Sequence, residues 1–318
     1  MVIPLRSALV TGGAGFIGSH LVEKLVAGGC RVTVLDDLSS GHASNLEAVA
    51  GGITFMRGSI CDRETVAKAA AGCEVVFHLA AVVSVPKTVD DPLGSAAVNE
   101  TGSLNVLEAA RGARSQRVVF ASSSAVYGDD PGLPKREDMP PKPLTPYGVQ
   151  KLAVEYYLRV YNSLYGLEAV SLRFFNVFGP RQDPSSPYSG VISIFMNKAL
   201  TGERPAIYGD GRQSRDFVFV EDVVQALISA AKSSSAPGKA FNVGTGKSLT
   251  ISGLWEVIAA LSGSGVKPAI QPPRPGDIPH SLSAIDSAAA DLGYVPRVSL
   301  ESGLGLTLDW YRGSTPKK

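Results

Sequence analysis

The stretch Thr11-Gly12-Gly13-Ala14-Gly15-Phe16-Ile17-Gly18 decides the fold. It follows the apolar run 8–11 and opens a helical pattern, and its glycines satisfy both Gly-x-Gly-x-x-Gly and Gly-x-x-Gly-x-x-Gly. Such a loop suits a pyrophosphate, because one glycine makes the turn, one lets the backbone approach the phosphates and one lets helix and strand pack closely. The loop therefore predicts a βαβ unit that binds a dinucleotide.

An acidic residue stands where such a unit needs it. Asp36 closes the next apolar run and lies 18 residues beyond Gly18. A carboxylate at this place can hold the adenosine ribose 2′-hydroxyl of NAD and would repel the 2′-phosphate of NADP. We therefore expect NAD to be the preferred cofactor.

Short apolar runs alternate with helical patterns through the first half of the chain. The strands are predicted at 8–11, 31–35, 53–57, 74–79, 117–122 and 168–173, and the helices at 19–27, 63–71, 95–113 and 147–165. Strands that alternate with helices indicate a parallel sheet with right-handed crossovers. The predicted fold class is α/β, a doubly wound parallel sheet of the Rossmann type.

After about Asn176 the elements become shorter and are broken by Gly and Pro, with helices predicted at 191–201, 221–232 and 252–262. The run 217–220 still has the pattern of a buried strand, so the chain is expected to re-enter the large sheet there. We predict an NAD-binding domain of residues 1–175, with 215–243 returning to it. Residues 176–214 and 244–318 would form a smaller C-terminal α/β domain that binds the substrate.

Composition excludes several classes of protein. With 318 residues and 44% hydrophobic content the chain can bury a sizeable core. A net charge of +1 argues against a nucleic-acid or membrane partner. The three cysteines lack Cys-x-x-Cys spacing, so neither a metal site nor a disulfide framework is expected. With no signal sequence or membrane-length run, these features favour the cytoplasm.

Tyr147-Gly148-Val149-Gln150-Lys151 is the candidate catalytic stretch, downstream of Ser122-Ser123-Ser124. A four-residue step places both side chains on one face of a helix. A free tyrosine titrates near pH ~10, so a base at neutral pH needs about 4 kcal/mol of phenolate stabilisation, and a nearby cation can supply much of it. Alone, Tyr-x-x-x-Lys also fits a packed ring and a solvated lysine. The glycine loop upstream favours the catalytic interpretation.

Taken together, these motifs resemble the extended short-chain dehydrogenase/reductases, specifically nucleotide-sugar 4-epimerases of the UDP-galactose epimerase type. The matching segments run in family order over nearly the whole chain: 11–18, 36–41, 78–81, 98–102, 122–128, 147–151, 173–181, 215–217 and 274–277. The resemblance implies Ser123, Tyr147 and Lys151 as the catalytic set. His78, beside the expected cofactor path, is interpreted as a packed residue.

The resemblance also implies the ligand contacts. Those to NAD would come from Gly12, Gly15, Phe16, Ile17, Asp36, Asp37, Leu38, Ser39, Ser40, Gly41, Ser59, Ile60, Leu79, Ala80, Ala81, Asn99, Ser122, Tyr147, Lys151 and Phe174. Those to a UDP-sugar would come from Ser84, Ser123, Ser124, Asn176, Arg181, Val191, Ile207, Tyr208, Arg215, Arg274, Asp277 and Ser281. Independently, Arg215 and Arg274 suit a pyrophosphate, because guanidinium groups match phosphate oxygens.

The implied reaction is inversion at C4. Tyr147 removes the proton of the 4-hydroxyl while C4 gives its hydride to NAD, and the 4-keto sugar then turns over and takes the hydride on its other face. Related 4,6-dehydratases and UDP-glucuronate decarboxylases carry acids where this chain has Ser124 and Ala125, so these alternatives are disfavoured. A non-catalytic NAD-binding regulator is a distant alternative, which the intact catalytic set disfavours.

Three expectations concern the substrate and assembly. Ser281 stands where strict glucose/galactose enzymes carry a bulky aromatic, which leaves room for an N-acetyl group at C2. Arg181 could pair with a C6 carboxylate and make UDP-glucuronate the substrate, or it could simply structure its loop. The family resemblance further implies a homodimer formed through a four-helix contact of the helices 95–113 and 147–165.

Overall fold

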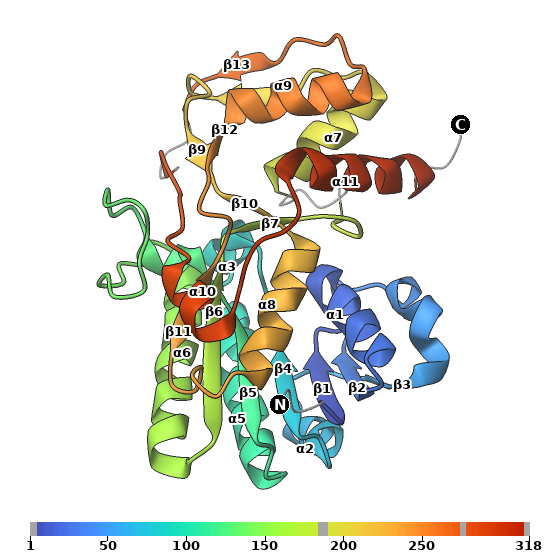
Figure 1. The fold of residues 1–318 in the computed structure, drawn as a ribbon, viewed down its shortest axis with the longest axis vertical. Helices are drawn as coiled ribbons and strands as arrows, with labels where there is room; N and C mark the ends of the chain where they lie inside the picture. Colours follow the sequence, from blue (N-terminus) through green and yellow to red (C-terminus); the bar gives the residue numbers. More distant parts are fainter. Residues whose placement is uncertain (1–4, 184–189, 274–277, 315–318) are drawn as a thin grey trace.

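The computed structural model describes residues 5–183, 190–273 and 278–314. Its centre is a parallel sheet of seven strands: β1 (Ser7–Thr11), β2 (Arg31–Asp36), β3 (Ile53–Arg57), β4 (Val75–His78), β5 (Arg117–Ser123), β6 (Glu168–Phe174) and β11 (Ala240–Val243). They lie in the order β11-β6-β5-β4-β1-β2-β3 (Figure 1). The six strands predicted from the sequence and the doubly wound parallel sheet are confirmed.

The strand that returns to the sheet differs from the predicted one. The run 217–220 instead forms β10 (Phe217–Phe219), which pairs with β7 (Asn176–Phe178) in a separate two-stranded sheet. Because β7 continues the chain beyond the end of β6, a strand beside β7 lies outside the large sheet. The chain then returns through α8 (Val220–Lys232), and β11 pairs with β6.

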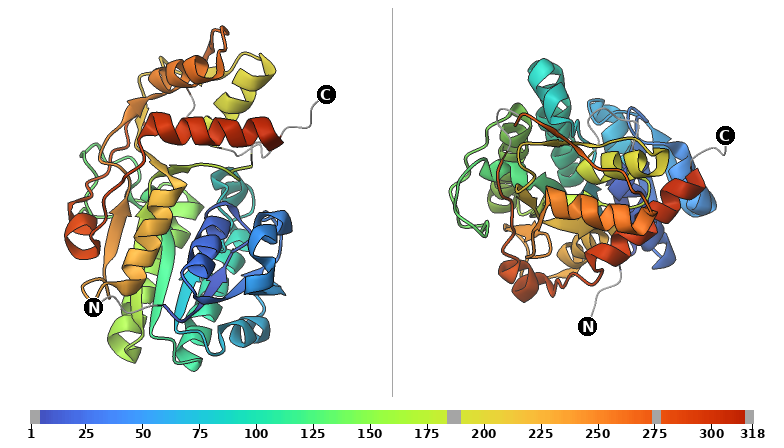
Figure 2. Two further views of the ribbon diagram at one scale, coloured as in Figure 1. Left: turned by 45° about the vertical axis from the view of Figure 1, so that its right-hand side comes forward. Right: turned by 90° about the horizontal axis from the view of Figure 1, so that it is seen from above.

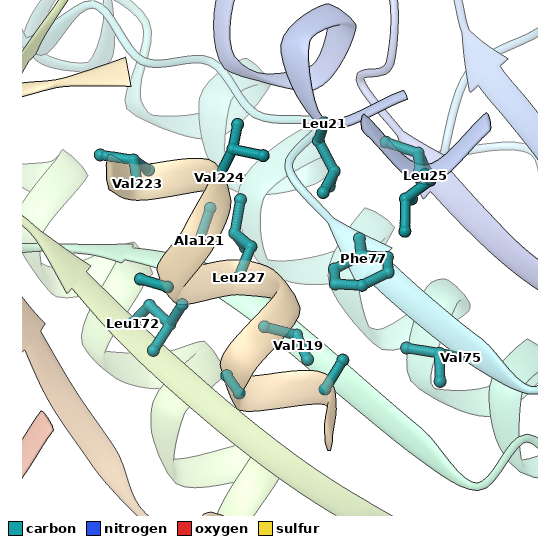
Figure 3. Close-up of a cluster of buried hydrophobic side chains, with 14 of the residues drawn as sticks. Leu21, Leu25, Val75, Phe77, Val119, Ala121, Leu172, Val223, Val224 and Leu227 are labelled. Carbon is teal, nitrogen blue, oxygen red and sulfur yellow. The ribbon is translucent and has the colours of Figure 1, made fainter. Parts of the chain in front are cut away.

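Helices cover both faces of the sheet. On one face α1 (Phe16–Ala27) and α8 pack their apolar sides against β4, β5 and β6, as Figure 3 shows for Leu21, Leu227 and Leu172. On the other face lie α2 (Arg63–Ala70), α5 (Ser103–Gly112) and α6 (Pro146–Tyr165). Since both faces are covered, the strands read as continuous apolar runs.

The helix predicted at 95–113 is divided. It consists of α4 (Pro92–Ala96), the π-helical segment η2 (Ala97–Gly102) and α5, and it is preceded by α3 (Val85–Asp90). Within η2, Asn99 turns inward and is 3% exposed. Its amide bonds both backbone groups of Val82 and the Gln150 side chain, so the segment fixes the chain that follows β4.

A smaller layer lies beyond the carboxyl ends of the strands (Figure 2). Its core joins α7 (Val191–Thr201), α9 (Ile251–Ser262) and α11 (Leu300–Ser314), with Phe195 and Trp255 in edge-to-face contact at 5.5 Å. Two strand pairs extend it, β8 (Ala206–Tyr208) with β13 (Ala269–Gln271) and β9 (Ser214–Arg215) with β12 (Leu249–Thr250).

The remaining elements are η1 (Ala43–Gly52), η3 (Ser124–Tyr127) and α10 (Asp286–Leu292). Among the helices that the structure describes, none combines the length and apolar character needed to cross a bilayer.

Candidate active site

The first turn of α6 delivers the candidate base. Thr145 caps the helix by accepting a hydrogen bond from the Gly148 N–H at 3.3 Å, and Pro146 occupies the first turn, where its missing N–H costs nothing. A Cβ at Gly148 would lie 2.8 Å from the Ala125 carbonyl oxygen, so only glycine lets α6 pack this closely against η3. Tyr147 therefore meets the end of β5, where Ser123 lies.

The structure brings Ser123, Tyr147 and Lys151 together, the last two on one face of α6 as their spacing predicts. Lys151 is 4% exposed, and its ammonium donates to the Ala121 carbonyl at 2.7 Å. It also lies over the rings of Phe120 and Tyr147, 4.7 and 5.8 Å from their centroids. The cation is thus near the phenol ring, but its shortest polar contact is with the backbone of β5.

Burial governs the protonation of both groups. It lowers the pKa of Lys151 to about 7, against the opposing charge of Glu155. It raises the pKa of Tyr147, against a hydrogen bond with Ser123 that favours the phenolate. The expected lowering of the tyrosine pKa by the lysine is therefore not the dominant effect in this structure, because desolvation of the phenolate outweighs it.

A buried polar network supports the site from behind. Glu155 accepts a hydrogen bond from Ser122 Oγ at 2.5 Å and pairs with Arg173, whose Nη2 lies 2.7 Å from Glu155 Oε2. Arg173 also donates to the Tyr127 hydroxyl at 2.9 Å. Ser122 is predicted to contact NAD, but its hydroxyl hydrogen is already donated to Glu155. Sequence reasoning missed Glu155, although it continues the four-residue spacing from Lys151.

The glycine loop has the shape that a dinucleotide requires. Gly12 has φ +71°, and a Cβ there would lie 2.7 Å from the Ala80 nitrogen. At Gly18 a Cβ would lie 2.1 Å from the Gly12 carbonyl oxygen, so helix and loop touch. Gly15 is the N-cap residue of α1, and among the described residues no side chain caps the N–H groups of its first turn. The first N–H groups of α1 are thus available to an anion.

Asp36 lies beside this loop, 7% exposed. Its carboxylate accepts one bond from the Ala14 N–H at 2.9 Å and one from the Leu38 N–H at 2.8 Å. Burial raises the pKa of Asp36, and these two N–H groups oppose that rise. Each oxygen keeps a second lone pair, so the carboxylate can still accept a ribose hydroxyl. The loop and acid therefore fit NAD.

The other predicted NAD contacts gather near the carboxyl ends of the strands. Phe16 and Ile17 open α1, Leu79, Ala80 and Ala81 follow β4, Phe174 ends β6, and the segments after β2 and β3 supply Asp37, Leu38, Ser39, Ser40, Gly41, Ser59 and Ile60. Asn99 is the exception, because its side chain is bonded to Val82 and Gln150. His78 is packed as predicted, between the hydroxyls of Thr11 and Ser103, each 2.8 Å away.

A cavity of about 310 Å³ opens in front of Ser123 and Tyr147. It contains the predicted substrate residues Ser123, Ser124, Asn176, Arg215 and Ser281. Sequence reasoning missed other residues of its wall: Val85, Gly128, Lys135, Leu144, Thr145, Ile278 and His280. They come from segments far apart in the chain, so no local motif marks them.

Other predicted substrate residues lie elsewhere. Ser84 caps α3 by accepting from the Lys87 N–H at 3.2 Å, although its neighbour Val85 reaches the cavity. Val191 opens α7, and Ile207 and Tyr208 belong to β8, so the three lie in the smaller layer. Arg274 and Asp277 lie outside the described residues.

Arg181 is not among the described residues that line the cavity, and its contacts favour the second of its two interpretations, a role in structuring its loop. Its Nη2 pairs with Glu23 Oε1 of α1 at 2.5 Å, and its Nη1 donates to Ser19 Oγ at 3.2 Å. The residue has φ +68°, and His20 contacts the carbonyl of the preceding Pro180 at 3.0 Å. Arg181 thus fastens the segment after β7 to α1, as the alternative interpretation held.

Comparison with known proteins agrees with this geometry. A family model described as the NAD dependent epimerase/dehydratase family matches residues 8–244. A UDP-glucose 4-epimerase of Mycolicibacterium smegmatis is 43% identical, over 96% of this chain and 99% of the relative.

Two solved structures are similar over almost their full length. One is a UDP-glucose 4-epimerase of Thermotoga maritima with UDP-glucose, with a TM-score of 0.93, 40% identity and coverage of 97% of this chain and 99% of that one. The other is a UDP-N-acetylglucosamine 4-epimerase of Methanobrevibacter ruminantium in complex with UDP-N-acetylmuramic acid. Its TM-score is 0.94, with 40% identity and coverage of 98% of this chain and 100% of that one.

Proposed function

Because the chain belongs to the NAD-dependent epimerase/dehydratase family, we propose that it is a UDP-hexose 4-epimerase that inverts C4 through a transient 4-keto sugar. One observation carries this choice within the family. Ser123 and Tyr147 face a cavity whose wall continues with Ser124 and Ala125, and none of the described residues that line it is an Asp or a Glu. Without an acid to protonate a leaving 6-hydroxyl, the keto sugar is reduced again rather than dehydrated.

NAD supplies the hydride acceptor for C4 and returns the hydride afterwards. The protein residues manage the proton. Tyr147 accepts the proton of the 4-hydroxyl as a phenolate and becomes a neutral phenol, and the Ser123 hydroxyl bonds the same substrate oxygen and steadies its developing charge. The Lys151 ammonium lies 5.8 Å from the ring centroid of Tyr147, so its charge stabilises the phenolate that takes this proton. Tyr147 then returns the proton when the sugar has turned over.

We assign the nucleotide half of the substrate to the smaller layer. Asn176 and Arg215 reach the cavity from β7 and β9, and a guanidinium beside a pyrophosphate forms charge-assisted hydrogen bonds. We also propose Arg274, Asp277, Val191, Ile207 and Tyr208 as contacts to the UDP moiety. In this division 1–175 hold NAD while 176–214 and 244–318 hold UDP, and the return to the large sheet begins at α8.

The test is direct. The purified protein is incubated in turn with UDP-glucose, UDP-N-acetylglucosamine and UDP-glucuronate, and the C4 epimer is sought by proton NMR. We expect the axial epimer of at least one sugar, formed without added NADPH. A 4-keto-6-deoxy sugar would identify a dehydratase instead, and released carbon dioxide from UDP-glucuronate a decarboxylase.

We further propose that two copies pair through α5 and α6, which lie side by side at one edge of the molecule (Figure 1). The outer face of α6 exposes Tyr156, Tyr157, Val160 and Leu164, the last at 70%. Such a contiguous apolar face is typical of an interface. Sedimentation should give a dimer, which Leu164→Asp splits and Leu306→Asp on α11 does not. A monomeric wild type would refute the pairing.

We also place the enzyme in the cytoplasm. Cys30, Cys61 and Cys73 are free thiols, which suits a reducing compartment. Fractionation of cells that express the chain should find it with cytoplasmic markers, and recovery in the membrane or secreted fraction would contradict the assignment.

A further inference from the structure

Lys135 is a buried cation in the wall of the substrate cavity. Its residue is 3% exposed, and it shares the cavity with Ser124, Tyr147 and Ser281. The backbone holds it firmly, because its N–H donates to the Leu282 carbonyl at 2.7 Å and its carbonyl accepts from the Ala284 N–H at 2.9 Å. The two backbone hydrogen bonds hold the Lys135 main chain at the wall of the cavity, from which its side chain extends.

The ammonium has few partners for a buried charge. Of its three N–H donors, one meets the Asp130 carbonyl oxygen, and the described residues provide no other hydrogen-bond acceptor. The Asp130 carboxylate is itself bonded to Lys142 Nζ at 2.9 Å and to the Gly132 N–H at 2.9 Å. Burial lowers the pKa of Lys135, against the charges of Asp130 and Asp129. An anion in the cavity would complete the coordination of this charge.

Other candidate cations are less suitable for an acidic sugar. Arg215 lines the cavity too, but it is assigned to the pyrophosphate. Arg181 is paired with Glu23 on α1, outside the cavity. His280 lines the cavity, but its Nδ1 contacts Ser214 Oγ at 3.0 Å. No described residue of the cavity wall is an Asp or a Glu, and the two acidic residues whose charges act on Lys135, Asp129 and Asp130, do not line the cavity.

We propose that Lys135 is the residue that recognises an acidic substituent on the hexose, so that the preferred substrates are UDP-hexuronates. This inference rests on the proposed 4-epimerase function and adds the substrate class. A charge-assisted hydrogen bond between the Lys135 ammonium and the sugar carboxylate orients the ring over Tyr147. Ser281 leaves space in the same cavity, and a neutral UDP-hexose binds without this contact.

The experiment measures kcat/KM for UDP-glucuronate, UDP-glucose and UDP-N-acetylglucosamine with three proteins. They are the wild type, Lys135→Met, which keeps the length of the side chain and removes its charge, and Lys142→Met as the matched control. Lys142 lies on the same segment and pairs with the same Asp130, but its side chain is 58% exposed and does not line the cavity. Binding of the same three sugars to the NAD-loaded wild type is measured by calorimetry.

We expect Lys135→Met to lose on the order of 100-fold in kcat/KM for UDP-glucuronate, the scale of a charged hydrogen bond. The values for the two neutral sugars should change less than about threefold, and Lys142→Met should change none of them beyond that. Calorimetry should show the wild type binding UDP-glucuronate more tightly than UDP-glucose.

Several results would overturn the inference. An equal loss for all three sugars means that Lys135 only supports the wall, and a selective loss for UDP-N-acetylglucosamine means that it reads an acetamido group. Weaker wild-type binding of UDP-glucuronate than of UDP-glucose refutes it even if Lys135→Met fails to fold. Epimerisation of neutral sugars alone would refute the hexuronate preference and leave the 4-epimerase function standing. Dehydration or decarboxylation without epimerisation would refute the function itself.

Discussion

Replacing Glu155 with glutamine should destabilise the fold by about 3 to 5 kcal/mol, the usual cost of leaving one member of a buried ion pair without its partner. The side chains of Glu155 and Arg173 are only 5% and 7% exposed. Glutamine can still accept the bond from Ser122 Oγ. Its amide nitrogen, however, would face Arg173 Nη2, which lies 2.7 Å from Glu155 Oε2 in the wild type. Donor would then meet donor beside an uncompensated cation.

Urea denaturation followed by circular dichroism measures the change in the free energy of unfolding. Glu108→Gln is the matched control, because Glu108 pairs with Arg111 at 2.7 Å on the surface, where the two side chains are 31% and 47% exposed. Solvent screens this pair, so the control should lose less than about 1 kcal/mol. Equal losses in the two variants would refute the reasoning, since burial would then make no difference to the pair.

Three further predictions concern the catalytic face and the cofactor loop. Tyr147→Phe should lower the rate of epimerisation by about 10²- to 10⁴-fold with an unchanged circular dichroism spectrum, and near-normal turnover would exclude Tyr147 as the base. Burial lowers the Lys151 pKa to about 7, whereas an unfolded lysine titrates near ~10.4, so the unfolded chain binds more protons between these values and wild-type stability rises with pH there. Lys151→Met should therefore be more stable than the wild type below pH ~7, and this gain in stability should disappear by pH ~10. Urea denaturation of both proteins at the two pH values measures the gain. A gain that does not depend on pH would contradict the prediction. Gly12→Ala should abolish NAD binding, as measured by calorimetry. Gly12 has φ +71°, and a Cβ there would lie 2.7 Å from the Ala80 nitrogen, so the loop would have to move. Normal affinity for NAD would show that the loop tolerates the change.

The sequence predicts the parts of the fold that depend on local pattern. The six strands and their parallel direction follow from apolar runs separated by helical patterns. The seventh strand, β11, could not be predicted, because Ala240-Phe241-Asn242-Val243 is short and contains a polar residue. The side chain of Asn242 donates to the carbonyls of Lys135 and Ala284 and accepts from the Tyr127 hydroxyl, partners that are distant along the chain and that the sequence does not show to be near.

The candidate site follows the same division. Tyr147 and Lys151 share one helix, so their spacing alone brought them together. The role of Arg181 depended on Glu23, a partner 158 positions away along the chain. Lys135 reaches the cavity because its backbone pairs with residues 282–284, a contact that no motif encodes. Residue type indicates what a side chain can bind, and tertiary pairing decides what it does bind.

The charges along α6 explain why its first turn is the reactive one. Tyr147, Lys151 and Glu155 follow one another at four-residue spacing on the same face. The carboxylate of Glu155 is already bonded to Arg173 and Ser122, so its charge is largely compensated. Lys151 has a carbonyl and two aromatic rings as its near neighbours, and a carbonyl carries no net charge. The Tyr147 phenolate, from which the reaction starts, is therefore the negative charge that Lys151 can pair with. Glu155 and Arg173 pair with each other one turn further along α6, so the Lys151 charge remains available to the Tyr147 phenolate.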